Sequence, residues 1–298
     1  MIVGVDEIAR IEDELTQLAR QGNAASLSRP GRASVALSRL GACAFTRPRG
    51  EAGSEALLNT DNFLVEATTV ANEDALVLAL AHGNYKDPGC AFASAVAVCE
   101  VHAELAKPLL GPADVPQALR RALLNANTRI QGLARSDVSG RGIGTVGGAR
   151  TDLRGIGASV LAAVVTRQET VIAHVGENRA LLLRDGRLRQ LVVPHTFWFS
   201  QGHERRARMG TTEAAVAQDV PVRILGMSDA IAIDVLRSPG APGDRLLIGN
   251  GGFRVVREEP ALAWGAPPEA LLDALVRVSA ERARWVPPTV IVADVYTS

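Results

Sequence analysis

Three glycines in one loop offer the first candidate chemistry. Gly142, Gly144 and Gly147 spell G-x-G-x-x-G, a pattern with which a backbone loop can approach the pyrophosphate of a dinucleotide. That chemistry needs a strand before the glycines and a helix after them, because the helix N-terminus receives the phosphates. Here residues 116–134 have helical spacing and precede the loop, whereas the apolar run 158–165 follows it. The order is reversed, so we expect a connecting loop and not a dinucleotide site.

The cysteines and histidines show no metal-binding spacing. Cys43, Cys90 and Cys99 are odd in number and form no C-x-x-C pair, which indicates small buried thiols of a reducing compartment. His195 and His203 have no partners at the spacings of known metal motifs. We therefore predict that both histidines are structural or solvated.

Composition limits the classes of function. The chain has 298 residues, of which 47% are hydrophobic, enough for a large buried core. Its formal net charge is zero, which disfavours binding to nucleic acid or to anionic membranes. The apolar runs are too short to span a membrane, so the cytoplasm is the expected location. The abundance of Arg and Ala over Lys indicates a G+C-rich, bacterial genome.

The centre of the chain has the pattern of closely connected strands. Asp185-Gly186 separates two apolar runs, and this dipeptide is a strong hairpin signal because both turn residues must reach positive φ. A second reversal falls at residues 176–178, so we predict a meander of three antiparallel strands over 170–193. The run 158–165 predicts a fourth, fully buried strand.

Helical patterns flank this centre. Residues 90–105, 116–134 and 268–284 are predicted helices, and strands are expected over 75–81, 230–236 and 246–249. An amphipathic helix over residues 6–20 either docks on its own domain or contacts a second chain, and residues 21–32 read as a linker. We therefore divide the chain into an N-terminal helix with its linker (1–32) and one domain (33–298). The stripe of that helix consists of Ile8, Ile11, Leu15 and Leu18.

The segment from His174 to Gly186 carries a family resemblance. The order His-Val-Gly-Glu-Asn-Arg-Ala, followed by Leu-Arg-Asp-Gly, resembles the H-V-G-D-S-R-A-Y-L-x-R-D-G signature of type 2C, or PPM-type, metal-dependent Ser/Thr protein phosphatases. The resemblance runs from about residue 35 to residue 295. It implies an α+β fold in which two antiparallel β-sheets pack face to face with helices on both outer sides, in αββα layers.

The positions that would bind metal in that family are mostly changed. Asp61 matches an acidic ligand, but Thr60 stands in place of its glutamate neighbour, and the metal-bridging aspartate is replaced by His82. A neutral imidazole cannot bridge two hard cations as a carboxylate does. Ala56 replaces the phosphate-binding arginine, although Arg47 or Arg49 could reach the same space. The resemblance thus defines a vestigial metal site formed by Asp61, His82, Gly83, Asn250 and Val286.

These departures predict a domain without catalytic residues and without a cofactor. If it is active, Mn²⁺ or Mg²⁺ is implied by the resemblance. Two arrangements of the vestigial site stay open: Asp61 and His82, together with a water or Asn250, hold one zinc-like ion weakly, or His82 bonds to Asp61 and fills the former cation space.

The leading hypothesis is therefore an inactive regulatory or protein-binding module of bacterial Ser/Thr phosphorylation signalling. Its expected partner is a protein, either a Ser/Thr kinase or a phosphoprotein, and a homodimer is a further expectation. Phe197, Trp198 and Phe199 form either a contact patch or a plug beneath the flap segment 197–218. The alternatives are a divergent phosphatase with a rearranged metal site and a sensor that binds a small molecule or phosphopeptide in the old cleft.

Overall fold

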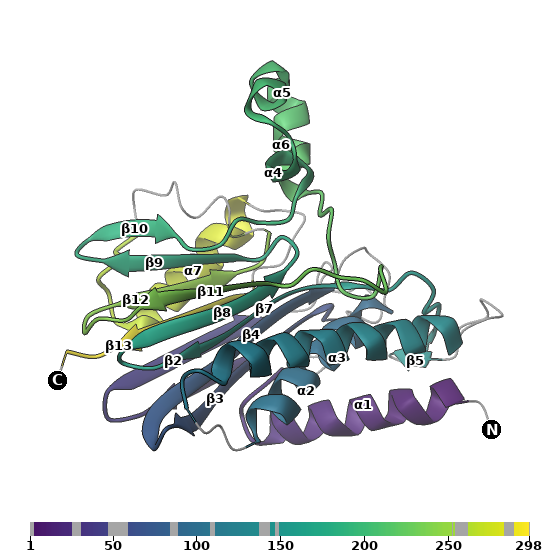
Figure 1. Ribbon diagram of the computed structural model, residues 1–298, viewed down its shortest axis with the longest axis horizontal. Coiled ribbons are helices and arrows are strands. Elements are labelled where there is room, and N and C mark those ends of the chain that lie inside the picture. Colours follow the sequence, from purple (N-terminus) through teal and green to yellow (C-terminus); the bar gives the residue numbers. More distant parts are fainter. Residues whose placement is uncertain are drawn as a thin grey trace.

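Two β-sheets packed face to face form the body of the protein (Figure 1). The computed structural model describes residues 3–25, 31–46, 59–83, 89–107, 111–136, 144–146, 149–251, 253, 262–282 and 289–297. Every strand pair within these residues is antiparallel, and helices cover the outer face of each sheet. The predicted α+β sandwich is confirmed.

One sheet has six strands in the order β1-β2-β13-β12-β9-β10. The Asp185-Gly186 turn joins its last two strands as predicted, and both residues have positive φ. The strands are β1 (Gly31–Ala36), β2 (Leu40–Thr46), β9 (Arg179–Arg184), β10 (Arg187–Gln190), β12 (Arg245–Gly249) and β13 (Val290–Val295).

The other sheet has five strands in the order β11-β8-β7-β4-β3. Every residue of β7 is buried, as its continuous apolar run predicted. The strand expected over 230–236 begins only at Asp234. The strands are β3 (Asp61–Val70), β4 (Glu73–Gly83), β7 (Ala158–Val165), β8 (Glu169–Val175) and β11 (Asp234–Pro239).

The connection at residues 176–178 differs from the predicted meander. β8 pairs with β7 and β11, whereas β9 pairs with β12 and β10, so the chain crosses here from one sheet to the other. Gly176 has a φ of 107°, and a Cβ at this position would collide with Ser159. The prediction was wrong because a short connection reverses the chain without requiring that both strands belong to one sheet. This crossing brings a loop from between the sheets close to the ends of β3 and β4.

Helices cover the two outer faces of the sandwich. α2 (Cys90–Leu105) and α3 (Val115–Ser136) pack on the five-stranded sheet. α1 (Val3–Arg20) packs on these two helices. α7 (Pro268–Arg282) covers the six-stranded sheet (Figure 1). The core is therefore layered, with one apolar cluster between the sheets and one beneath each helical layer.

The apolar stripe of α1 belongs to the core of its own domain. Ile8, Ile11, Leu15 and Leu18 are at most 5% exposed, and the Arg129 guanidinium on α3 bonds to two glutamates of α1. The interpretation of this stripe as a contact surface for another chain is wrong, because α2 and α3 already cover it. The boundary placed between residues 32 and 33 also falls inside β1.

The Gly-rich loop between α3 and β7 contains a short ribbon. β5 (Gly144–Val146) pairs with β6 (Ala149–Thr151), so Gly144 begins a strand and not a helix. Gly142 and Gly147 lie outside the described residues. The predicted connecting role of this loop is confirmed.

A helical projection extends away from the sandwich (Figure 1). It consists of α4 (Phe197–Ser200), α5 (His203–Arg208) and α6 (Thr211–Asp219), and we call it the flap. Among the described residues, no helix combines the length and apolar character needed to cross a membrane.

Candidate functional site

Asp61 and His82 form the centre of the candidate site. They are register partners in the antiparallel β3–β4 ladder, at the start of one strand and near the end of the other. Their side chains lie on the same face, and His82 Nδ1 is 2.6 Å from Asp61 Oδ1. Both residues are buried: 2% of the surface of Asp61 and 4% of that of His82 is exposed. Of the two arrangements predicted for this site, the structure shows the one in which His82 forms a hydrogen bond with Asp61.

The second sheet supplies the remaining partners of the Asp61 carboxylate. Asn250, directly after β12, and Thr289, directly before β13, each donate to Oδ2 over 2.8 Å. Thr60 Oγ1 donates to Oδ1 over 3.3 Å. With His82 this makes four hydrogen bonds from described residues to one carboxylate, as many as its two oxygens have lone-pair sites.

Glu177 completes the site from the crossing between the sheets. Its Oε1 lies 3.2 Å from His82 Nε2, so the imidazole lies between two carboxylates. A Cβ added at Gly251 would lie 2.9 Å from Glu177 Oε2, so a side chain at this position would force the Glu177 carboxylate to move. Asp61, His82 and Glu177 thus form an acid–imidazole–acid bridge that joins β3, β4 and the crossing, and we call it the His82 bridge.

The electrostatics favour a charged His82. Burial opposes the charge, but Asp61 and Glu177 outweigh it and raise the pKa of His82 to about 9. At neutral pH both ring nitrogens therefore carry protons, and each faces a carboxylate oxygen. The imidazolium supplies a positive charge in a space where two anionic groups converge.

An outer layer of polar side chains supports this bridge. The Thr46 hydroxyl lies 2.8 Å from the Thr289 hydroxyl and 3.2 Å from the Asn59 side-chain oxygen, and it can donate its one proton to either of them. The Asn59 side-chain oxygen accepts the backbone N–H of Asp61. These contacts fix the Thr289 hydroxyl and the head of β3, so the partners of Asp61 are held in place by buried bonds.

The structure brings together most of the predicted vestigial site. Asp61, His82 and Asn250 are in contact, and Gly83 lies beside them, where its backbone N–H bonds to Thr60 O. Val286, Ala56, Arg47 and Arg49 lie outside the described residues.

Sequence reasoning missed Glu177 and Thr289. The signal for Glu177 was an acidic residue kept at the Asp position of the H-V-G-D motif. Thr289 gave no comparable signal.

The described donor set does not fit a pair of divalent cations. Mg²⁺ and Mn²⁺ favour anionic oxygen ligands, and all four acceptor positions of Asp61 are already used by N–H and O–H groups. The space between the two carboxylates holds the His82 ring. A cation would have to displace an imidazolium that both carboxylates stabilise.

The flap places its aromatic residues apart from this centre. Phe197, Trp198 and Phe199 are each half-buried, because α4 packs against α6 within the flap. Arg205 lies over the Phe197 ring at 5.5 Å, and Arg206 lies over the Trp198 ring at 5.9 Å. The aromatic residues therefore support the flap and still present part of their surface beside arginines.

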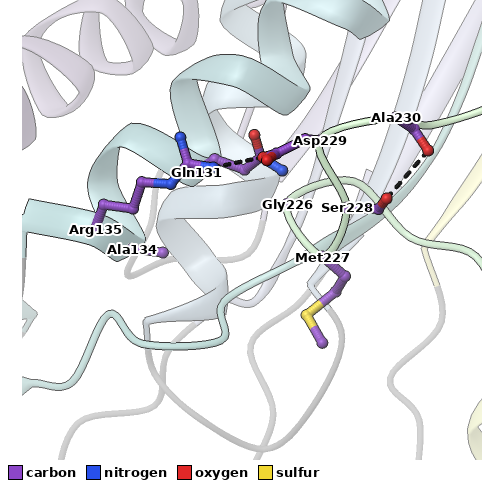
Figure 2. Close-up of a pocket in the computed structure, with 8 residues that line it drawn as sticks. All are labelled: Gln131, Ala134, Arg135, Gly226, Met227, Ser228, Asp229 and Ala230. Carbon is purple, nitrogen blue, oxygen red and sulfur yellow. Dashed lines mark hydrogen bonds and ion pairs between the residues drawn. The ribbon is translucent and has the colours of Figure 1, made fainter.

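A pocket of about 580 Å³ lies between α3 and residues 226–230 (Figure 2). Arg135 and Asp229 form an ion pair there, and the Ser228 hydroxyl donates to Ala230 O. None of the predicted site residues lines this pocket. Its charges neutralise each other and its hydroxyl is engaged, so the His82 bridge is the better candidate site.

Two antiparallel sheets with helices outside, and a polar site where strand ends of both sheets meet, define the fold class of the PPM-type Ser/Thr phosphatases. Comparisons with known proteins agree. A serine/threonine phosphatase, stp, from Listeria welshimeri is 29% identical over 150 residues, which are 49% of this chain and 52% of that protein. The chain thus spans about half the length of the curated relatives it matches.

Solved structures extend the likeness to most of the chain. The S. agalactiae serine/threonine phosphatase has a TM-score of 0.67 at 16% identity, and the match covers 86% of this chain and 99% of that one. The catalytic domain of the phosphatase PstP, solved in complex with two manganese ions, has a TM-score of 0.66 at 20% identity and covers 87% and 99%. No protein-family model matches the sequence. The solved structures show the fold of the PPM-type phosphatases, and the curated Ser/Thr phosphatases are similar to this chain over about half of its length.

Proposed function

We propose that this protein is a phosphatase-like regulatory module that does not hydrolyse phosphoesters and acts by binding another protein. The observation that carries the proposal is the His82 bridge. In this bridge the His82 imidazolium lies between Asp61 and Glu177, and the neutral side chains of Asn250 and Thr289 donate hydrogen bonds to Asp61. A two-metal mechanism needs two closely spaced cations held by carboxylates. In this site the protonated His82 ring lies where those cations would have to bind.

The flap is the surface that we assign to partner binding. It projects from the sandwich (Figure 1). Its helix α5 carries Arg205, Arg206 and Arg208, and the first two lie over the half-buried rings of Phe197 and Trp198. Arginine and aromatic side chains are enriched in protein interfaces, and arginine pairs bidentately with phosphate or carboxylate. A phosphoprotein or an acidic segment of a Ser/Thr kinase is the partner that this chemistry fits.

A second candidate function is a divergent metal-dependent phosphatase. The comparisons favour it, because the curated relatives are named Ser/Thr phosphatases and the similar PstP domain was solved with two manganese ions. Asp61 and Glu177 are two carboxylates that could contribute to such a site if His82 moved away. The contacts of His82 support the first function, whereas the relatives support the second.

An activity assay separates the two functions. The full chain is incubated with p-nitrophenyl phosphate and with phosphoserine peptides in millimolar Mn²⁺ or Mg²⁺, beside the Asp61→Ala variant. We expect equal, background-level rates for both proteins. Metal-dependent turnover that disappears in Asp61→Ala would establish the divergent phosphatase instead.

Partner binding needs its own experiment. The wild-type chain and the Arg205→Glu/Arg206→Glu variant are used to capture proteins from the native host, with Arg32→Glu as a control for charge alone. We expect the flap variant to lose a phosphorylation-dependent partner that wild type and control retain. Equal capture by all three would exclude the flap as the binding surface.

A further inference from the structure

A second cluster of potential ligands lies at the root of the flap and shares no residue with the His82 bridge. His174 near the end of β8 is the register partner of Asp234 at the start of β11, and His195 lies just before α4. One ligand atom from each of these three residues lies within 4.8 Å of the other two. The two imidazole rings have centroids 4.4 Å apart.

His174 has a nitrogen with no partner. Its Nε2 donates to Val193 O over 3.1 Å, which leaves the lone pair on Nδ1. Nδ1 is buried and makes no hydrogen bond to any described residue, and only 2% of His174 is exposed. A metal-binding histidine commonly donates its other N–H to a backbone carbonyl, which fixes the tautomer in this way. Burial lowers the pKa of His174 to about 4, so the ring is neutral near pH 7.

A cation already occupies part of the cluster. Arg223 Nη1 lies 2.8 Å from Asp234 Oδ1 and 3.1 Å from His195 Nε2, so it contacts two of the three potential ligands. The Arg223 side chain is about one third exposed and the Asp234 side chain about half exposed. The guanidinium can therefore turn into solvent, and the same opening gives an ion access to the site.

We propose that His174 Nδ1, His195 Nε2 and an Asp234 carboxylate oxygen bind one divalent ion of the zinc class, which replaces the Arg223 guanidinium. Two histidines and a carboxylate, with a fourth position open to solvent, form a common zinc ligand set. Bonds of about 2 Å place tetrahedral ligands roughly 3.3 Å apart, so ligand atoms that now lie as far as 4.8 Å apart must approach each other by up to about 1.5 Å.

Binding requires one proton shift in His195. Gly176 N–H donates to Nδ1 over 3.1 Å, which places the ring proton on Nε2, facing Asp234 Oδ2. When Nε2 binds the ion, that proton moves to Nδ1 and the Gly176 hydrogen bond is lost. We therefore expect micromolar affinity and not the tight binding of a preformed structural site.

The position of the cluster gives the ion a structural effect. Val222 N–H donates to His195 O, and Thr196 forms a bridge with Pro221, so both ends of the flap meet at this point. An ion held by His195, His174 and Asp234 would fasten the flap root to β8 and β11. This would also release Arg223 for contacts outside the cluster.

The test is direct binding of Co²⁺ and Zn²⁺ to the full, chelator-treated chain. Visible absorption of bound Co²⁺ reports tetrahedral coordination, and Zn²⁺ affinity follows from competition. We expect one ion per chain, at least tenfold weaker binding in His174→Ala and Asp234→Asn, and at least tenfold tighter binding in Arg223→Ala. The tighter binding expected in Arg223→Ala is the most decisive outcome. Unfolding of a variant can weaken metal binding, but it cannot make it tighter.

Two controls locate the ion. His102→Ala removes a part-buried histidine that pairs with Glu66 on the other side of the domain, and Asp61→Ala removes the centre of the His82 bridge. Both should bind Co²⁺ like wild type. Binding that survives His174→Ala, fails to tighten in Arg223→Ala or disappears in Asp61→Ala would overturn the proposal, as would no Co²⁺ spectrum at all.

Discussion

Asp61 and His82 face each other across the β3–β4 ladder, and their side chains meet at 2.6 Å in a buried space. This pairing connects the two sheets, because the same Asp61 carboxylate accepts bonds from Asn250 and Thr289 of the other sheet. A buried imidazolium with two carboxylate neighbours depends on them for its charge. Changes in either partner should therefore be measurable in stability as well as in metal binding.

The stability of the protein should fall as the pH rises from about 6.5 to 9. The pKa of His82 is raised to about 9 by Asp61 and Glu177 against the opposing effect of burial, from an ordinary value of 6.5. Its contribution is thus fully present below the unfolded pKa and is lost as pH rises through the folded pKa. Urea unfolding at pH 6.5 and pH 9 measures the difference. The His82→Gln variant should show a shallower dependence, and an equal slope would contradict the charged bridge.

Restoring carboxylates should create metal-dependent stability. The His82→Asp/Asn250→Asp variant replaces the imidazolium and a neutral amide by acids beside Asp61, so it should melt below wild type without metal because like charges converge. Millimolar Mn²⁺ should raise its melting temperature, and adding Val286→Asp should increase the rise. Wild type should not respond. The same variant with Asp61→Ala is the matched control, and an absent response in the restored variant would show that the vestigial geometry no longer supports a metal site.

α1 should contribute to the stability of the domain and not to its oligomeric state. Ile11 is completely buried beneath α2 and α3, so Ile11→Ala should reduce the free energy of unfolding by roughly 2–5 kcal/mol. Thr16→Ala on the exposed face is the control and should change it little. Sedimentation should give the same mass for both variants. If Ile11→Ala is fully folded but has a different mass in sedimentation, α1 contributes to contacts between chains.

The crossing between the sheets should tolerate no side chain at Gly176. Its positive φ and its contact with Ser159 predict that Gly176→Ala destabilises the protein by at least roughly 1–3 kcal/mol. Gly186 also has positive φ but has open space around it, so Gly186→Ala should cost only about 1 kcal/mol. Chemical denaturation of the two variants compares backbone strain alone, in Gly186→Ala, with backbone strain plus a collision with Ser159, in Gly176→Ala. Equal losses would mean that the Ser159 contact relaxes.

Local patterns in the sequence were sufficient for most elements of the fold. The apolar run 158–165 is a buried strand, and residues 90–105 form the predicted helix, because an apolar run indicates a buried element and its length separates strand from helix. The Asp185-Gly186 hairpin follows from the φ that its residues must adopt. The family resemblance supplied the arrangement of these elements into two sheets, which periodicity by itself does not contain.

The candidate site was predictable only where a motif marked it. Asp61, His82 and Asn250 were named because they occupy motif positions, and the alternative that His82 bonds to Asp61 followed from the chemistry of an imidazole beside a carboxylate. Glu177 was not assigned to the site, since its segment was interpreted as a hairpin within one sheet. Its place depends on the crossing, where a turn of three residues transfers the chain between sheets.

The sequence by itself determined the elements, the loss of carboxylates at His82 and Asn250, and the family to which the pattern is similar. Only the tertiary structure decided that α1 is part of the core, that Glu177 reaches His82, and that His174 and His195 meet Asp234 at the flap root. The physical reason is that backbone preference and apolar spacing are local properties. Contacts among charged side chains instead depend on which strand ends the packed sheets bring together.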